Sequence, residues 1–263
     1  IIDLEDSIAP PEKDATRILV KYALTEIDFG NCEVTVRINP LSTPYGLEDL
    51  EEIVPSAPDG IYIPKCEKSL DVREVESVVN RVRKEHKIEK EILLFPIIEN
   101  AMGVVKAYEI VAASPLVAAV AFGAEDFTAD IGVRKTKQGK ESFVARSNIV
   151  LAAKANDVQA LDTVWSDLED TEGLLNNTKE GIALGFDGRG IIHPGQVEYV
   201  HRAFAPQPEE IEKARKVVEA FQEAMSKGSG VIALGRKMID PPVVERAKRI
   251  LKIASLMGLV DRD

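Results

Sequence analysis

The sequence predicts an α/β fold of the TIM, or (β/α)8, barrel type, followed by a helical arm. Over residues 1–205, short runs rich in β-branched residues alternate with longer helical patterns, which is typical of parallel βα units. The runs ILLFPII and VAAVAFG are apolar without alternation, as expected for strands covered on both faces. No GxGxxG or GxxxxGK[ST] sequence follows an early run, which disfavours the competing fold, a doubly wound open sheet.

Seven strands and seven helices are expected in the barrel region, in alternating order. The strands are predicted at Ile1–Leu4, Glu33–Ile38, Gly60–Pro64, Ile92–Ile98, Val117–Phe122, Ala160–Trp165 and Gly190–His193. The helices are predicted at Pro11–Thr25, Leu47–Val54, Asp71–His86, Val104–Ala113, Ser142–Asn156, Thr171–Leu184 and Gly195–Ala203. A closed barrel needs eight strands and the first run starts at residue 1, so we expect the first barrel strand to precede this sequence.

The alternation stops after Pro206, and a different pattern follows. We expect a helix over Pro208–Ser226, a short apolar run at Val231–Leu234, and a last helix from Pro241 or Pro242, because proline is tolerated in the first helical turn. Residues 1–205 are therefore predicted to form the catalytic barrel and residues 206–263 an appended arm.

Composition excludes several classes of protein. The net charge of −11 argues against a nucleic-acid surface, because neutralising phosphates needs clustered Lys and Arg. Cys32 and Cys66 are far apart, so neither a disulfide framework nor a thiolate zinc site is expected, and a reducing compartment fits best. No apolar run approaches the roughly 20 residues of a membrane span. We expect a cytoplasmic protein, and the lack of an initiator Met leaves the mitochondrial matrix open.

Charged and polar residues follow the predicted strands, where TIM-barrel enzymes carry their active sites. They are Asp3, Glu5, Asp6, Arg37, Asn39, Lys65, Glu99, Asn100, Glu125, Asp126, Asp162, Asp167, Asp170 and His193. Convergent carboxylates without Cys or a paired-His motif suit Mg²⁺ or Mn²⁺. Glu99 and Asp126 are the best pair, because each follows a strongly apolar strand. The alternative is that these acids cap the helices that follow them.

Arg37 and His193 each allow two interpretations. Arg37 ends a buried strand in VRINP and needs an anion, either a substrate carboxylate or alkoxide or a barrel acid such as Asp3 or Glu5. His193 is the only His near a predicted strand end, and a hydrogen-bonded core residue is the favoured interpretation over a catalyst.

The segments DLEDSIAPPEKDATR, VTVRINP, GIYIPK, PIIENAMGV, AFGAEDFTADIG, GFDGRGIIHPGQV, YVHRAFAP and GSGVIALGRKMIDPPVVERAKRIL occur in this order along nearly the whole chain. This ordered set resembles the citrate lyase β-subunit family of the HpcH/HpaI aldolase superfamily, which is related to malyl-CoA and citramalyl-CoA lyases. The resemblance implies a TIM barrel that forms trimers or hexamers and binds Mg²⁺ and an acyl thioester of coenzyme A or acyl carrier protein.

The resemblance also implies roles for individual residues. Glu99 and Asp126 correspond to the metal ligands, and Arg37 to the residue that contacts the α-oxygen and carboxylate of the substrate. Asp240, in KMIDPP, corresponds to the acid/base residue, which reaches the barrel of a neighbouring subunit. Without the resemblance, Asp240 is interpreted simply as a helix N-cap. Asp3, Glu5 and Lys65 join Arg37 as expected substrate-binding residues.

The expected reaction is Mg²⁺-dependent cleavage of a carbon–carbon bond in a 3-hydroxy-acyl thioester, such as citryl-CoA or a citryl carrier protein. The products are a 2-oxo acid such as oxaloacetate and an acetyl thioester. Asp240 is the candidate to protonate the thioester enolate, and Asp3, Glu5 or Asp6 serves the other proton transfer.

Three alternatives stay open: a stand-alone malyl-CoA or citramalyl-CoA lyase, a subunit that docks an acyl carrier protein and works only with other citrate lyase subunits, and a pyruvate-enolate aldolase. No motif supports a nucleotide or redox cofactor.

Overall fold

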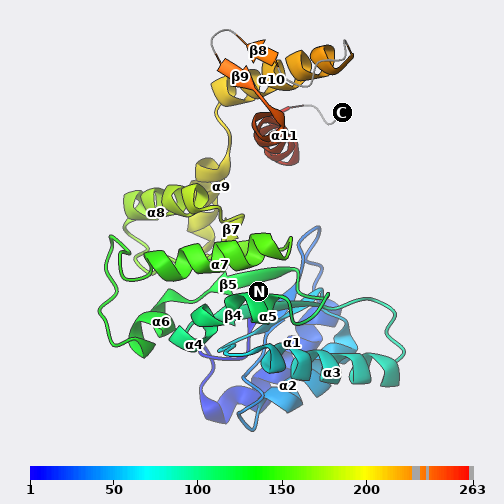
Figure 1. Cartoon of the computed structure of the whole chain (residues 1–263). Coiled ribbons are helices and arrows are strands. Elements are labelled where there is room, and N and C mark those ends of the chain that lie inside the picture. The colour runs from blue at the N-terminus through cyan, green and yellow to red at the C-terminus, as the bar shows by residue number, and fades with distance from the viewer. Residues whose placement is uncertain (227–231, 235–236, 261–263) are drawn as a thin grey trace. The chain divides into compact units, whose positions relative to one another are not determined.

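A curled sheet of seven parallel strands forms the centre of the first unit in this computed structural model (Figure 1). The structure describes residues 1–226, 232–234 and 237–260, and its contacts divide the chain into the units Ile1–Gln196 and Val197–Asp263. In the first unit the described strands are β1 (Ile2–Asp3), β2 (Thr35–Arg37), β3 (Gly60–Ile63), β4 (Leu93–Ile98), β5 (Ala119–Phe122), β6 (Gln159–Asp162) and β7 (Gly188–Arg189).

Each strand pairs in parallel with the next one along the chain, from β1 to β7. A doubly wound sheet reverses its strand order near the middle, so that alternative is wrong. The strictly sequential order confirms the predicted α/β class with parallel βα units, and it places the carboxyl ends of all seven described strands at one edge.

The helices of the first unit follow the predicted positions closely. They are α1 (Lys13–Glu26), α2 (Gly46–Ile53), α3 (Ser69–Glu85), α4 (Ala101–Val105), α5 (Ala107–Val111), α6 (Ala124–Asp130), α7 (Phe143–Ala155) and α8 (Thr171–Leu184). The short helix α6 was not predicted, and the helix expected over Val104–Ala113 is two short helices that meet at Lys106. The last strand was predicted at the wrong residues, because β7 ends before Gly190.

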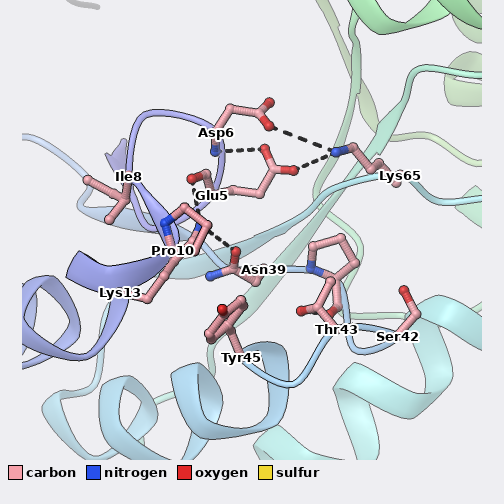
Figure 2. A pocket seen from close by; sticks show the side chains of 11 residues that line it. Glu5, Asp6, Ile8, Pro10, Lys13, Asn39, Ser42, Thr43, Tyr45 and Lys65 are labelled. Atoms are coloured by element: carbon pink, nitrogen blue, oxygen red, sulfur yellow. Dashed lines mark hydrogen bonds and ion pairs between the residues drawn. The ribbon is translucent and has the colours of Figure 1, made fainter.

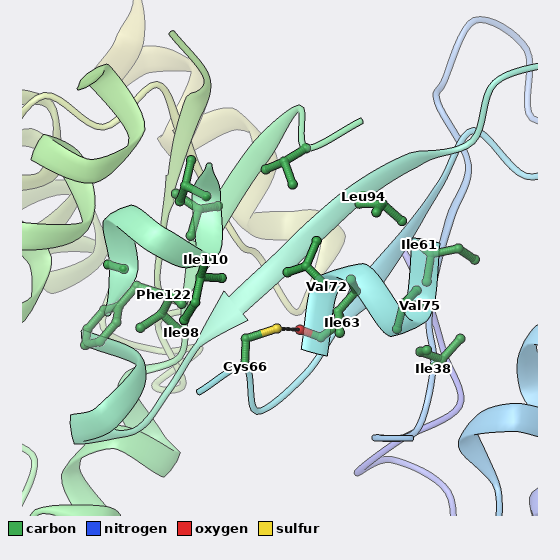
Figure 3. Close-up of a cluster of buried hydrophobic side chains, with 14 of the residues drawn as sticks. Ile38, Ile61, Ile63, Cys66, Val72, Val75, Leu94, Ile98, Ile110 and Phe122 are labelled. Carbon is green, nitrogen blue, oxygen red and sulfur yellow. Dashed lines mark hydrogen bonds between the residues drawn. The ribbon is translucent and has the colours of Figure 1, made fainter. Parts of the chain in front are cut away.

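Both faces of the sheet are covered, as the unbroken apolar runs indicated. On the helix side, Leu94 and Ile98 of β4 pack with Val75 of α3 and Ile110 of α5 in the main core (Figure 3). On the other face, Phe95 of β4 belongs to a separate cluster with the residues Tyr62, Ile97 and Ala119. The rings of Tyr62 and Phe95 stack with centroids 4.8 Å apart. Alternate residues of one strand therefore enter different cores, which explains the absence of polar alternation.

The second unit is mainly helical. It consists of α9 (Val197–Phe204), α10 (Pro208–Ser226), β8 (Ile232–Leu234), β9 (Lys237–Ile239) and α11 (Pro241–Leu256). Val217 of α10 packs with Val244 and Ala247 of α11. The predicted bounds of α10 and the start of α11 agree with the structure, whereas the antiparallel pairing of β8 with β9 was not predicted. In the described residues, no helix is long and apolar enough to cross a membrane.

Candidate functional site

The loop that follows β1 places carboxylates around the Arg37 guanidinium. Asp3 and Arg37 are paired residues on adjacent parallel strands, so their side chains lie on one face of the sheet. Arg37 Nε and Nη2 each donate to an Asp3 carboxylate oxygen at 2.6 Å, and Nη1 lies 3.1 Å from a Glu5 oxygen. This bidentate pair confirms the salt-bridge interpretation of Arg37. Its contact with a substrate remains a prediction.

The pKa values of the Asp3 and Glu5 carboxyl groups are shifted in opposite directions. Burial raises the pKa of Asp3, but hydrogen bonds from Arg37 and from the Glu5 N–H outweigh it and bring the pKa to about 2. Glu5 is only 4 % exposed, and burial raises its pKa. Asp3 is therefore a fixed anion at neutral pH, whereas Glu5 is closer to taking up a proton.

Lys65 connects this cluster to Glu99. Its Nζ donates to Glu5 Oε1 at 2.8 Å, and its backbone N–H donates to Glu99 Oε1 at 2.7 Å (Figure 2 shows the contact with Glu5). Lys65 has a φ of 55°, in the left-handed region that side chains other than Gly rarely adopt. The strained turn after β3 thus directs one residue's amide and side chain to two different carboxylates, a feature common at functional sites.

Glu99 lies beside Gly123, and its carboxylate interacts electrostatically with that of Asp126. A Cβ at Gly123 would lie 2.5 Å from Glu99 Oε2, so this position must be glycine for the carboxylate to lie there. Burial, together with the charges of Asp126 and Glu5, raises the pKa of Glu99 to about 8. Asp126 lies in the first turn of α6, whose N-cap residue Gly123 makes no side-chain cap. A carboxylate in the first turn interacts favourably with the helix dipole, so the position of Asp126 is compatible with the capping alternative as well.

The pair meets the chemical requirements of a Mg²⁺ site. Glu99 and Asp126 offer only oxygen donors. Burial and, to a lesser extent, the charge of Asp126 raise the pKa of Glu99, and a divalent cation would favour the ionised carboxylate against both. No cluster of three or more His, Cys, Asp or Glu ligands exists among the residues that the structure describes. Two carboxylates leave coordination positions for water and substrate oxygens, which is how Mg²⁺ is commonly held in enzymes.

A network of buried hydrogen bonds holds the loop that follows β1 in place. Lys13 Nζ donates to the carbonyl oxygens of Leu4 and Glu5 at 2.8 and 2.7 Å and to Asn39 Oδ1 at 2.7 Å. Asn39 in turn donates to Asp49 Oδ2 at 2.7 Å. The sequence interpretation included Asn39 but missed Lys13. The available signal was position, because Lys13, Arg17 and Val20 fall on one helical face of α1, and all three are buried.

Replacing Lys13 with Met should destabilise the protein and impair the site together. The change removes the Lys13 donor from three oxygens. The Leu4 and Glu5 carbonyls each keep one other donor, from Asn39 and Ile8, whereas Asn39 Oδ1 loses its donor, and we expect the free energy of unfolding to fall by about 2–4 kcal/mol. Urea denaturation with and without Mg²⁺ measures the effect. Lys21→Met on the same helix removes a partly exposed pair with Glu52 and should cost less than about 1 kcal/mol. Equal effects of the two substitutions would contradict this role for Lys13.

Other predicted site residues lie outside this cluster. Asp162 is buried and holds Arg146 Nη2 at 2.6 Å, so it belongs to a structural ion pair. Asp167 and Asp170 pair with Lys137, and Glu125 pairs with Lys135. Asn100 caps α4 by accepting from the Gly103 N–H.

The core interpretation of His193 is wrong. Its side chain is exposed, and its Nδ1 accepts a hydrogen bond from the Gly195 N–H at 3.0 Å. His193 therefore shapes the turn after β7.

Asp240 lies in the second unit, where it caps α11. Its Oδ1 accepts from the Val243 N–H at 3.2 Å, which confirms the N-cap interpretation. The capping bond uses one carboxylate oxygen, so it is compatible with a second role, which remains a prediction.

Carboxylates, an arginine and a lysine gather at the carboxyl ends of the parallel strands, which is where α/β enzymes carry their active sites. The comparisons with known proteins agree. Residues 1–194 match the model of the HpcH/HpaI aldolase/citrate lyase family, and the chain belongs to that family. The resemblance inferred from the ordered segments is thereby confirmed.

Two curated relatives illustrate the similarity. The chain is 40 % identical to the citrate lyase subunit beta of Leuconostoc mesenteroides subsp. cremoris over 264 residues, which cover all of this chain and 87 % of the relative. It is 34 % identical to the mitochondrial citramalyl-CoA lyase of Homo sapiens over 265 residues, which cover 97 % of this chain and 78 % of the relative.

Solved structures agree with the fold. Protein CitE from Mycobacterium tuberculosis, solved with magnesium, acetoacetate and coenzyme A, is 31 % identical with a TM-score of 0.77, covering 96 % of this chain and 88 % of that one. A citrate lyase from Burkholderia xenovorans has a TM-score of 0.85 at 24 % identity, covering 97 % of this chain and 83 % of that one. The latter supports the fold alone.

Proposed function

We propose that this protein is a Mg²⁺-dependent lyase that cleaves a 3-hydroxy-acyl thioester of the citryl type to a 2-oxo acid and an acetyl thioester. The observation that carries the proposal is the continuous chain of contacts from Arg37 through Glu5 and Lys65 to Glu99, whose charge interacts with that of Asp126. It gathers an anion-binding cation and a divalent-metal ligand set in one place. The family membership supports the reaction class.

The proposal also includes a closed barrel and a homo-oligomeric assembly. The sequential parallel order supports a closed (β/α)8 barrel, of which the described strands form seven. We infer a homo-oligomer, a trimer or a hexamer, in which the arm of one chain carries Asp240 to the barrel of another. Residues 206–263 are then the arm, and the barrel comprises residues 1–205.

The residues of the chain divide the chemistry among them. Glu99 and Asp126 would hold Mg²⁺, which when bound supplies a Lewis acid for the carboxylate and hydroxyl oxygens of the substrate. Arg37 binds the oxygen that becomes the new carbonyl, because its guanidinium remains charged beside Asp3. Lys65, whose side chain is 45 % exposed, borders the same space and is available to the substrate.

Glu5 is the best candidate for the base. Asp3 is held as a bidentate anion with a pKa of about 2, which makes it a weak base, and Asp6 is exposed. Glu5 accepts the hydroxyl proton, the new C=O forms, and the electrons of the broken C–C bond pass to the α-carbon of the thioester as an enolate. Asp240 of a neighbouring chain then protonates that carbon.

A product assay tests the function. The isolated protein receives citryl-, citramalyl- and malyl-CoA, with Mg²⁺ or with EDTA, and 2-oxo acid and acetyl-CoA are measured. We expect both products with Mg²⁺ and none with EDTA. Free coenzyme A without a 2-oxo acid would indicate hydrolysis, the activity named for the (3S)-malyl-CoA thioesterase of Cereibacter sphaeroides, a relative at 32 % identity.

The stand-alone citramalyl-CoA lyase is the second candidate, favoured by the 34 % identity with the human relative. The same assay separates it by substrate preference. Activity only after addition of an acyl carrier protein and partner subunits would favour the complex-dependent alternative, and pyruvate release from substrates without a thioester would favour the aldolase.

A further inference from the structure

The carboxylate of Asp130 joins the two chain segments that carry the proposed metal ligands. Asp130 is the last residue of α6, and its Oδ2 accepts a hydrogen bond from the Ala101 N–H at 2.8 Å. Ala101 is the first residue of α4 and follows Glu99 closely in the chain. Asp126 precedes Asp130 by about one helical turn of α6. One hydrogen bond therefore closes a short path from one proposed metal ligand to the other.

The start of α6 is fixed to β4 independently of that bond. The Gly123 N–H donates to the Ile98 carbonyl at 3.0 Å, directly after the parallel pairing of β4 with β5. The buried ring of Phe127 packs against Phe122 of β5, with centroids 5.4 Å apart, and this contact fixes the rotation of α6 about its axis. Among the hydrogen bonds of the described residues, only the one that Asp130 accepts joins the C-terminal end of α6 to the segment after β4.

The position of Asp130 is unfavourable for its own helix. A carboxylate in the last turn of a helix interacts unfavourably with the helix dipole, whereas the same group is favourable at a helix N-terminus, as Asp130 is for α4. The start of α4 already has a local cap, because Asn100 Oδ1 accepts from the Gly103 N–H at 2.7 Å. Ala101 is exposed, so water could satisfy its N–H. Neither helix needs this bond to form, and what it adds is the connection between them.

We propose that Asp130 is a positioning residue that sets the spacing of Glu99 and Asp126 for Mg²⁺. This rests on the proposed function, because it takes that pair as the metal ligands. Two ionised carboxylates that share a metal repel each other in its absence, and the bond to Ala101 limits how far α6 can move away from β4. The bond therefore raises the affinity for the metal by organising its ligands before it binds.

Binding of Mg²⁺ to the metal-free protein tests this role. With Asp130→Ala, we expect calorimetric titration to give a Kd for Mg²⁺ that is about fivefold higher or more, because the two segments lose their connection. Asp130→Asn keeps an oxygen that can accept from Ala101 but loses the charge, so its Kd should stay within about twofold of wild type. At saturating Mg²⁺, kcat for citryl-CoA should change less than about twofold in either variant, since the bound metal holds its ligands together. Glu125→Ala is the matched control, because it removes another exposed acid from α6, and its Kd should not change.

Equal weakening of Mg²⁺ binding by Asp130→Ala and Asp130→Asn would mean that the charge of Asp130 attracts the metal, and would overturn the spacing role. So would an unchanged Kd in Asp130→Ala. Hydrogen exchange in EDTA gives a second readout, in which the Ala101 amide exchanges faster in Asp130→Ala than in wild type or Asp130→Asn, and equal rates in all three would also overturn the role. A wild type that binds Mg²⁺ but cleaves no thioester refutes the proposed reaction while these measurements still decide the role of Asp130. A wild type that binds no Mg²⁺ refutes both.

Discussion

Glu99→Gln should abolish Mg²⁺-dependent cleavage and at the same time stabilise the metal-free protein at pH 8. The amide keeps an oxygen that accepts from the Lys65 N–H, so the local fold is retained, but the ligand charge is lost. We expect kcat to fall by about a thousandfold. Activity at saturating Mg²⁺ measures this, and a near-normal kcat would refute the metal assignment.

The stability effect has a definite sign. The folded-state pKa of Glu99 is about 8 against 4.5 for an ordinary glutamate, so folding opposes its ionisation. Wild type therefore loses stability as pH rises from about 4.5 to about 8, and Glu99→Gln does not. In EDTA, the variant should exceed wild type by about 2–4 kcal/mol at pH 8 and by little at pH 4.5.

Urea unfolding at the two pH values measures this difference. Glu125→Gln is the matched control, because Glu125 is an exposed acid next to Asp126 and pairs only with Lys135 among the described residues. It should change neither kcat nor the pH dependence. A variant that is inactive yet more stable at pH 8 distinguishes a functional carboxylate from a structural one, whose removal destabilises.

The raised pKa of Glu99 should also make the binding of Mg²⁺ depend on pH. Mg²⁺ binds the ionised carboxylate, so its binding releases a proton below pH 8, and its Kd should rise by up to about tenfold per pH unit as pH falls. Titration calorimetry in two buffers of different ionisation enthalpy reports the released proton. A Kd that is independent of pH would contradict the raised pKa.

The sequence revealed the sheet and the acidic pair because both depend on local patterns. The run ILLFPII showed no polar alternation since its alternate residues enter two cores, and Glu99 follows it directly. Strand order then followed from parallel βα topology. What could be predicted was therefore which residues reach the carboxyl edge of the sheet.

The sequence did not reveal which of those edge residues meet. Asp162 and Glu5 both lie near strand ends. Asp162 forms an ion pair with Arg146 and Glu5 forms one with Arg37, and tertiary packing determines which arginine each carboxylate meets. The left-handed turn at Lys65 leaves no compositional trace, because the residue is not glycine. Lys13 was missed because a helical lysine is normally solvated, and its burial depends on three oxygens from other segments.

Mixing two inactive variants should restore activity if Asp240 acts on a neighbouring barrel. Arg37→Ala removes the cation that binds Asp3 and Glu5, and we expect a fall in kcat of about a hundredfold or more, because the oxygen of the new carbonyl loses its donor. It should also cost about 2–3 kcal/mol of stability, since Asp3 loses its cation and Glu5 keeps only Lys65. Asp240→Ala removes the proton donor and, as the α11 N-cap, about 1 kcal/mol.

In a mixed oligomer, a site is complete when its barrel comes from the Asp240→Ala chain and its arm from the Arg37→Ala chain. With equal mixing and random assembly, about one quarter of the sites meet both conditions, so activity should recover to about a quarter of wild type. Co-expression with two different affinity tags isolates the mixed species. Arg37→Ala mixed with Glu99→Ala is the matched control, because both residues belong to the same barrel and no complete site can form. Mixed oligomers without recovered activity would mean that Asp240 does not complete a neighbouring site, and the acid/base role would then have to be sought among the carboxylates of the β1 loop.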